Sequence, residues 1–177
     1  EEENSIDFIN LPPNSFDPLF VSDSLLRYAV GSDDGTNGYE LALARNDPVR
    51  VFSLPFRDVT VLWGDETYVY NRPASQFTGS LYRVDAMLKP VLPEEFGFVG
   101  GVTDTFYLGS SVVDGKFVSY AVERKTGKRS ALPITYIPEK CATNEINTPI
   151  LWCASPFEAF PESFLEDWYQ GRVHSQD

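Results

Sequence analysis

The chain has 177 residues and a formal net charge of −12 at pH 7. This length is sufficient for one domain with an apolar core, and so acidic a surface repels the phosphate backbone of nucleic acids. No stretch approaches the roughly 20 apolar residues of a membrane-spanning helix. We therefore expect no nucleic-acid partner and no transmembrane segment. The densest basic stretch, residues 124–129 (RKTGKR), is predicted to be a solvated hairpin turn.

A degenerate pattern with a period of about 40 residues repeats four times along the chain. Two strand-like segments separated by a turn-rich stretch recur in each repeat, and three repeats add a segment containing Leu-Pro. Four short strands at this period are typical of β-propeller blades. The sequence therefore predicts an all-β fold of about four blades, each with four antiparallel strands. The second strands are expected at residues 25–30, 67–71, 105–109 and 149–154, the third at 39–45, 80–85, 116–123 and 169–175, and the fourth at 51–56, 89–93 and 130–134.

The two ends of the chain are offset from this repeat. Residues 7–12 (DFINLP) match the Leu-Pro strands, so the chain is expected to begin with an outer strand that lacks its own blade. Residues 8–11 could close a small propeller by pairing beside residues 169–175. Alternatively, residues 1–177 form a portion of a larger propeller, which is the reading we favour. In both cases the whole chain is treated as one propeller domain or propeller portion.

The first strand of each blade should be the innermost and the least polar. Residues 59–63 (VTVLW) and 96–102 (FGFVGGV) fit this description. Gly97, Gly100 and Gly101 in the second segment are expected to let neighbouring strands approach closely.

The connections between second and third strands are predicted to be long, variable loops on one face of the propeller, where a ligand would bind. They are expected at residues 31–38, 72–79, 110–115 and 155–168. In residues 31–38, Asp33, Asp34 and Asn37 are candidate ligand-binding residues. Their oxygens and the adjacent glycines also suggest a calcium loop, but the pattern does not match an EF-hand, and a plain turn is the favoured interpretation. No metal site is predicted. In residues 72–79 the candidates are Arg72, Gln76 and Phe77.

The last of these loops, residues 155–168, is the most distinctive. Aromatic side chains are interspersed there with four carboxylates, a mixture suited to sugars, cationic groups or a basic peptide. The aromatic spacing also fits one face of a short helix, in which case the rings would pack the loop onto the blade. The candidate ligand-binding residues of this region are Phe157, Phe160, Phe164, Trp168 and Tyr169, and the carboxylates are Glu158, Glu162, Glu166 and Asp167.

Cys141 and Cys153 are the only cysteines, and the eleven residues between them include a turn-prone run at residues 143–149 (TNEINTP). If they face one another across a hairpin, their Cα atoms come close enough for a disulfide. Two buried free thiols are the alternative. We predict the disulfide, which in turn indicates an extracytoplasmic compartment, because disulfides persist in oxidising environments.

Signals for catalysis are sparse. A single histidine cannot readily build a Ser-His-Asp or Cys-His site, and the chain contains no Gly-x-Ser-x-Gly, phosphate-binding loop or His-Glu-x-x-His motif. A glycosidase needs only two carboxylates, but nothing in the sequence selects a pair among the 26 acidic residues. We expect no cofactor.

The last repeat carries the most specific resemblance. Residues 138–141 (PEKC), 151–156 (LWCASP) and 166–171 (EDWYQG) resemble a blade pattern of uncharacterised propeller-like proteins of bacteria. The resemblance covers about the last 40 residues, and the remainder is similar only to propeller blades in general. It implies a propeller fold and a secreted or cell-envelope location, and it implies no known activity.

The function that the sequence favours is therefore a non-catalytic module that binds a protein or a carbohydrate through variable loops. One alternative is a propeller-fold, carbohydrate-active hydrolase with paired carboxylates. Another is a purely structural array of blades inside a larger assembly. Two carboxylates facing each other across a pocket, about 5–9.5 Å apart, would favour the hydrolase.

Overall fold

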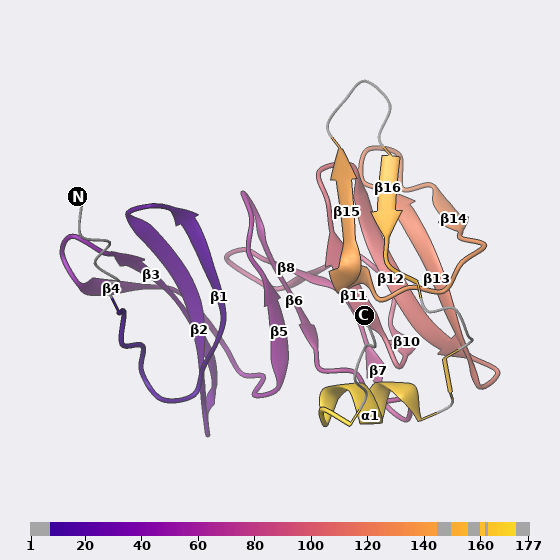
Figure 1. The fold of residues 1–177 in the computed structure, drawn as a ribbon, viewed down its shortest axis with the longest axis horizontal. Coiled ribbons are helices and arrows are strands. Elements are labelled where there is room, and N and C mark those ends of the chain that lie inside the picture. Colours follow the sequence, from indigo (N-terminus) through magenta and orange to yellow (C-terminus); the bar gives the residue numbers. More distant parts are fainter. Residues whose placement is uncertain (1–7, 145–149, 156–159, 162, 173–177) are drawn as a thin grey trace, which may run out of the picture. The chain divides into compact units, whose positions relative to one another are not determined.

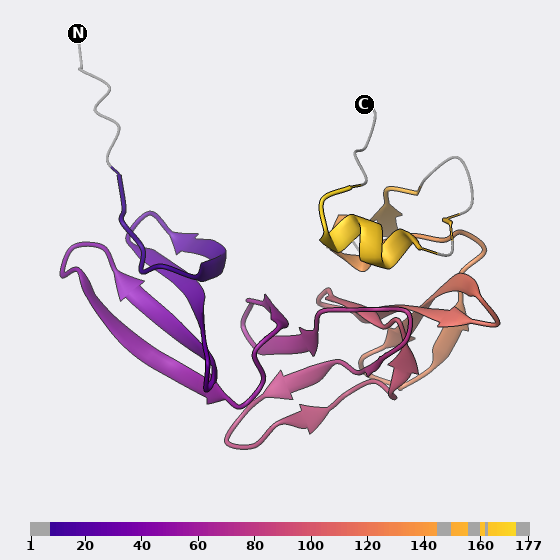
Figure 2. The same ribbon diagram turned by 90° about the horizontal axis from the view of Figure 1, so that it is seen from below.

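The computed structural model describes residues 8–144, 150–155, 160–161 and 163–172. The chain forms two compact units, residues 1–58 and 59–177. The first unit contains one antiparallel sheet with the strand order β1-β2-β3-β4, drawn in indigo and violet in Figures 1 and 2. Its strands are β1 (Ser15–Ser22), β2 (Leu25–Ser32), β3 (Gly35–Ala42) and β4 (Asp47–Leu54).

The start of this sheet differs from the prediction. The described part of residues 7–12 forms no strand, and β1 lies further along the chain. β1 is not recognisable as a strand from the sequence, because Asp17-Pro18 is typical of a turn. Asp17 has a left-handed φ of 47°, and the pairing with β2 is irregular between Phe16 and Leu19. A bulge in an edge strand thus accommodates a proline that cannot donate a backbone hydrogen bond.

The second unit contains two further four-stranded antiparallel sheets and two short two-stranded ones, so the predicted all-β fold is confirmed. Each four-stranded sheet pairs its strands in chain order. The second sheet comprises β5 (Val59–Leu62), β6 (Thr67–Asn71), β8 (Tyr82–Val84) and β9 (Lys89–Pro90). The third sheet comprises β11 (Val99–Val102), β12 (Phe106–Val113), β13 (Lys116–Glu123) and β14 (Arg129–Ala131). The short sheets pair β7 (Thr78–Gly79) with β10 (Glu95–Phe96) and β15 (Cys141–Asn144) with β16 (Ile150–Cys153).

The third sheet is covered by protein on both faces. Gly100 is on the face toward the second sheet, where a Cβ atom would lie 3.1 Å from Leu81 and 3.2 Å from Tyr70. Gly101 is on the opposite face, where a Cβ atom would lie 2.7 Å from the Cβ of Pro138. Because successive residues of a strand alternate between faces, this glycine pair lets other elements approach both sides. The close approach predicted for Gly100 and Gly101 is therefore confirmed. The strand predicted at residues 96–102 is interrupted, because Gly97 lies in a turn between β10 and β11 with a left-handed φ of 58°.

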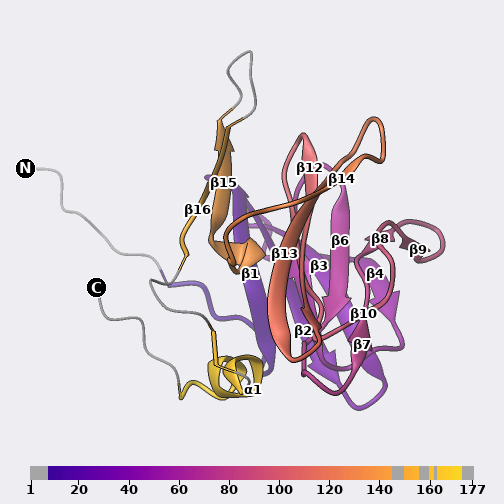
Figure 3. The ribbon, with the colours of Figure 1, turned by 90° about the vertical axis from the view of Figure 1, so that its right-hand side faces the viewer.

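The β15–β16 hairpin covers part of the second face of this sheet (Figure 3). Leu151 and both cysteines pack there against a buried cluster that includes Leu108 and Tyr136. Cys141 and Cys153 are directly opposite one another, with Cα atoms 4.1 Å apart, and they form the predicted disulfide. The backbone N–H of Ala154 donates to the carbonyl of Lys140 in the adjacent pair, so the cysteines occupy a non-hydrogen-bonded position, where opposing Cα atoms are closest.

The prediction of a third strand at residues 169–175 is wrong for the residues that the structure describes. Tyr169 ends the helix α1 (Phe164–Tyr169), and residues 170 and 171 form a turn. Phe164 and Leu165 of α1 are buried against residues of the second and third sheets. The helix-like spacing of the aromatic residues is therefore confirmed for Phe164 and Trp168, whereas Phe160 lies before the helix. Residues 173–175 lie outside the described part of the chain.

Two of the predicted long loops are tight turns instead. β2 and β3 are joined through Asp33-Asp34 alone, and β12 and β13 through Asp114-Gly115. The φ angles of Asp114 and Gly115 are 51° and 73°, as in the type I′ turns that suit the twist of a hairpin. The glycines and polar residues of these stretches misled the prediction, because most of them lie within the strands. Among the described residues, no helix is long and apolar enough to cross a membrane.

Replacing both cysteines by alanine is expected to lower the free energy of unfolding by about 2–3 kcal/mol, because the disulfide limits the freedom of the unfolded chain. Denaturant unfolding with and without a reductant measures the effect. The wild type in reductant should approach the stability of the variant, and the variant should not respond to reductant. Equal stability of the oxidised wild type and the variant would contradict the prediction.

Candidate functional site

The first group of predicted ligand-binding residues lies in the first unit. Asp33 and Asp34 form the exposed turn between β2 and β3. Asn37 lies within β3, opposite Val30 of β2 and Ser53 of β4, and its side-chain oxygen is buried without a hydrogen-bond partner among the described residues. The three residues therefore do not form a loop surface. Their role in binding stays a prediction.

The second group lies where it was expected, in the irregular segment between β6 and β7. Arg72 and Gln76 are exposed, and the ring of Phe77 is 73% exposed. The backbone N–H of Phe77 donates to the carbonyl of Ala74, which closes a turn at Ser75-Gln76. This turn presents polar side chains at the end of β6.

The third group, the aromatic residues near the C-terminus, mostly packs against the sheets. The rings of Phe160 and Phe164 are 3.9 Å apart between centroids, and Phe117 of β13 and Trp168 lie within 6.2 Å of the Phe164 ring. Phe164 is only 5% exposed. These rings pack α1 against the sheets of the second unit, as the packing alternative predicted, and so they position the helix. Phe157 lies outside the described residues.

Tyr169 attaches the other end of α1 through a carboxylate. Its hydroxyl donates to Glu139 at 3.3 Å, and the hydroxyl of the fully buried Tyr70 donates to the same oxygen of Glu139. Burial, followed by the negative charge of Glu139, raises the pKa of Tyr169. Tyr169 therefore remains a neutral donor at physiological pH. Together with the aromatic stack, this bond fixes the position of α1 relative to β6.

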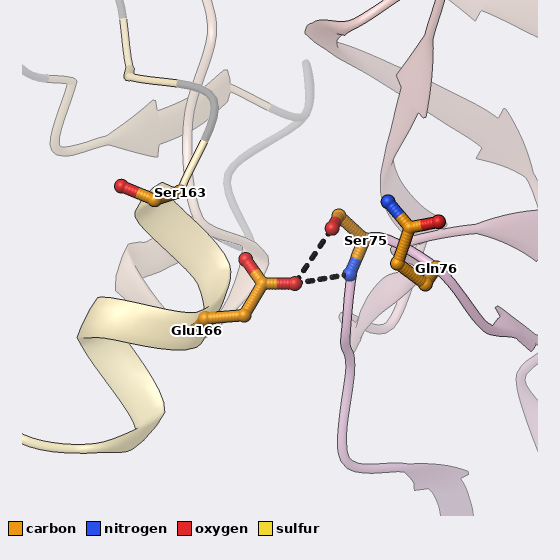
Figure 4. A pocket seen from close by; sticks show the side chains of 4 residues that line it. All are labelled: Ser75, Gln76, Ser163 and Glu166. Atoms are coloured by element: carbon orange, nitrogen blue, oxygen red, sulfur yellow. Dashed lines mark hydrogen bonds between the residues drawn. The ribbon is translucent and has the colours of Figure 1, made fainter.

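Between α1 and the segment after β6 lies a hollow of about 480 Å³ that is broadly open to solvent, and we call it the Glu166 pocket. Of the described residues, Ser75, Gln76, Ser163 and Glu166 line it. The Glu166 carboxylate points toward Ser75 and accepts hydrogen bonds from its backbone N–H at 2.8 Å and its hydroxyl at 2.6 Å (Figure 4). The Ser163 hydroxyl points away and donates to Asp167. Two of the loops singled out by the sequence thus meet at one pocket.

Two opposing effects set the pKa of the Glu166 carboxyl group. Burial alone would raise the pKa of its carboxyl group, but the hydrogen bonds from Ser75 outweigh burial and lower the pKa below its ordinary value of 4.5. Only one carboxylate oxygen receives these bonds. The other oxygen is buried and has no hydrogen-bond partner among the described residues. An ionised carboxylate with a free, desolvated oxygen is a strong acceptor for an N–H or O–H group.

The sequence selected Gln76 for this pocket but missed Ser75, Ser163 and Glu166. Glu166 was noticed only as one of four carboxylates in the aromatic loop. No local pattern distinguishes it, because its role depends on contact with Ser75, 91 residues away. Exposed aromatic residues attracted the prediction, whereas the pocket is built around the Glu166 carboxylate and the serine that binds it.

The described residues show no group of three or more His, Cys, Asp or Glu side chains placed to hold a metal ion. No model of a known protein family matches the sequence, and no curated protein matches it.

Phe164→Ala is expected to lower the free energy of unfolding by about 3–5 kcal/mol, because it removes the centre of a buried aromatic stack. Phe77→Ala is the matched control, since its exposed ring should contribute less than about 0.5 kcal/mol. Thermal or denaturant unfolding measures both. A small effect of Phe164→Ala would show that α1 is not attached as described.

Glu166→Gln is expected to cost about 1 kcal/mol near neutral pH, because Ser75 then donates to a neutral group. The folded-state pKa of Glu166 lies below its unfolded-state value, so the contribution of its charge is complete above about pH 4.5 and is lost as the pH falls through the folded-state pKa. Unfolding measured between about pH 7 and pH 3 should therefore show the two proteins converging in acid. The exposed Glu94→Gln is the control, and a pH-independent difference for Glu166→Gln would refute the assignment.

Proposed function

We propose that the chain is a non-catalytic binding module of the β-propeller type, located outside the cytoplasm, whose Glu166 pocket takes a basic side chain of a protein partner. The observation that supports the proposal most directly is the ionised Glu166, with one buried oxygen that has no hydrogen-bond partner among the described residues. A lysine or arginine side chain offers that oxygen a charge-assisted hydrogen bond.

The surroundings of the pocket support a protein partner. Phe77 follows the pocket residue Gln76 directly and leaves most of its ring in solvent. Exposed aromatic residues beside a charged anchor are common in protein interfaces. The net charge of −12 also attracts basic partners over long distances.

The sheets support the propeller part of the proposal. Each of the three four-stranded sheets pairs its strands in simple chain order, as blades do. The third sheet is covered on both faces, which is what a blade between two neighbours requires. The resemblance of the last repeat to bacterial propeller-like proteins is part of the same proposal, and the disulfide is consistent with an extracytoplasmic location.

The alternative, a carbohydrate-active hydrolase, has less support at this pocket. Of the described residues that line it, only Glu166 carries a carboxyl group, whereas glycoside hydrolysis ordinarily uses two. The lowered pKa of Glu166 also makes it a poor general acid near neutral pH.

A displayed library of random peptides tests the proposal. Selection for peptides that bind the wild-type protein is expected to enrich sequences with lysine or arginine. Glu166→Gln should weaken the binding of an enriched peptide by about tenfold or more, as expected for loss of a bond to a charged group. Glu94→Gln removes the same charge from an exposed position and should leave affinity nearly unchanged. Enrichment of peptides without basic residues, or equal binding by Glu166→Gln, would overturn the proposal.

A further inference from the structure

A second hollow lies at the opposite end of β6 from the Glu166 pocket. It has a volume of about 410 Å³, and we call it the Trp63 depression. It is formed by the β5–β6 turn, the β11–β12 turn and the residue that follows β13. The residues that matter for its chemistry are Trp63, Asp65, Glu66, Tyr68, Asp104 and Arg124. Its volume falls within the range of small-molecule sites.

The floor of the depression is a fixed polar network centred on Glu66. The Tyr68 hydroxyl and the Arg124 guanidinium both donate to one carboxylate oxygen, and Arg83 donates to the other at 3.0 Å. The hydrogen bond from Tyr68, together with the two positive charges, lowers the pKa of Glu66 despite its partial burial. Glu66 is therefore ionised at physiological pH, and both its oxygens are occupied by the protein.

Arg124 is held in place on several sides. Its guanidinium also donates to the backbone carbonyls of Thr103 and Asp104, at 3.2 and 3.4 Å, and lies 5.2 Å from the centroid of the Tyr107 ring. The prediction that residues 124–129 form only a solvated turn is therefore wrong for Arg124. A floor of this kind needs little reorganisation when a ligand arrives, which lowers the cost of binding.

The carboxylates at the rim of the depression, unlike Glu66 in the floor, are exposed. Asp65 and Asp104 are exposed, and their carboxylates have no partner among the described residues. Trp63 is half-buried and contributes an aromatic side chain to the lining of the hollow. The rim therefore offers hydrogen-bond acceptors beside an aromatic surface.

The charges limit what can bind. An anion would meet three carboxylates, whereas a cation would meet the guanidinium of Arg124 in the same hollow. Arg83 and Arg124 offset two of the three negative charges, so little net charge remains to select an ion. A neutral ligand with several hydroxyl groups satisfies the free carboxylates, because each hydroxyl can donate. The C–H face of a sugar ring suits the indole of Trp63.

We infer that the Trp63 depression is a carbohydrate-binding site that takes a neutral mono- or disaccharide, with Trp63 as the stacking surface and with Asp65 and Asp104 as acceptors for hydroxyl groups. The inference adds a second site to the proposed function and does not depend on the Glu166 pocket, since the two sites lie at opposite ends of β6.

The chain has three tryptophans, so the indole N–H signals in a ¹⁵N-labelled sample report on the sites separately. The probes are the neutral disaccharides cellobiose, maltose, xylobiose, mannobiose and chitobiose. At least one should shift the Trp63 signal saturably, with a Kd of about 1 mM or below, while the signal of Trp168 on α1 stays in place. Trp63→Phe assigns the signal.

Asp65→Asn combined with Asp104→Asn should weaken the binding of that sugar by about fivefold or more. Both side chains are exposed, so the fold should survive. Asp58→Asn, at another exposed aspartate, is the matched control and should bind like the wild type. Glu166→Gln should also bind like the wild type, so that this test and the test of the proposed function can fail independently.

Failure of all five disaccharides to shift Trp63 would overturn the inference. Tighter binding of inorganic phosphate or of the peptide Gly-Lys-Gly at the same signal would also overturn it, in favour of an ion site. Unchanged sugar affinity in the double aspartate variant would remove the assigned role of the rim.

Discussion

The third sheet, β11–β14, has apolar groups on both faces, and covering both faces stabilises it because apolar surface leaves water. This coverage organises the second unit. The second sheet lies against one face, where Gly100 lets Tyr70 and Leu81 come close, and residues 134–141 with the disulfide-bonded hairpin lie against the other. Each covering layer removes apolar surface from water, which stabilises the fold by about 25 cal/mol per Å² of apolar area buried. The turns at the two ends of these layers then carry the polar side chains.

Tyrosines connect this apolar interior with the polar ends. Tyr70 is wholly buried, yet its hydroxyl reaches Glu139, and Tyr68 on the same strand reaches Glu66. Each ring contributes to the core while its hydroxyl binds a carboxylate at one of the two ends. One strand, β6, therefore sets the geometry near both the Glu166 pocket and the Trp63 depression. The two hollows differ because one is bordered by a helix and the other by turns.

The sequence predicted the strands whose apolar residues are contiguous, including both bounds of β6 and β13, and it predicted the disulfide. It failed where local chemistry and tertiary context disagree. Asp17-Pro18 resembles a turn but lies in a bulged edge strand, and the glycines of residues 31–38 resemble a loop but lie mostly within β3. The pockets were harder still. Ser75 and Glu166, or Glu66 and Arg124, come together only through the packing of the sheets, and no spacing in the sequence records that contact.

The disulfide has a consequence for the thiol chemistry of residues 1–177. The chain has two cysteines, and each is the other's partner, so the oxidised protein presents no thiol. It cannot form a mixed disulfide with another molecule by its own nucleophilic attack, and it gives thiol-directed reagents nothing to modify. A covalent dimer through cysteine would first require the β15–β16 link to be opened by an external thiol. Oxidation therefore keeps the molecule a single covalent unit while it stabilises one hairpin.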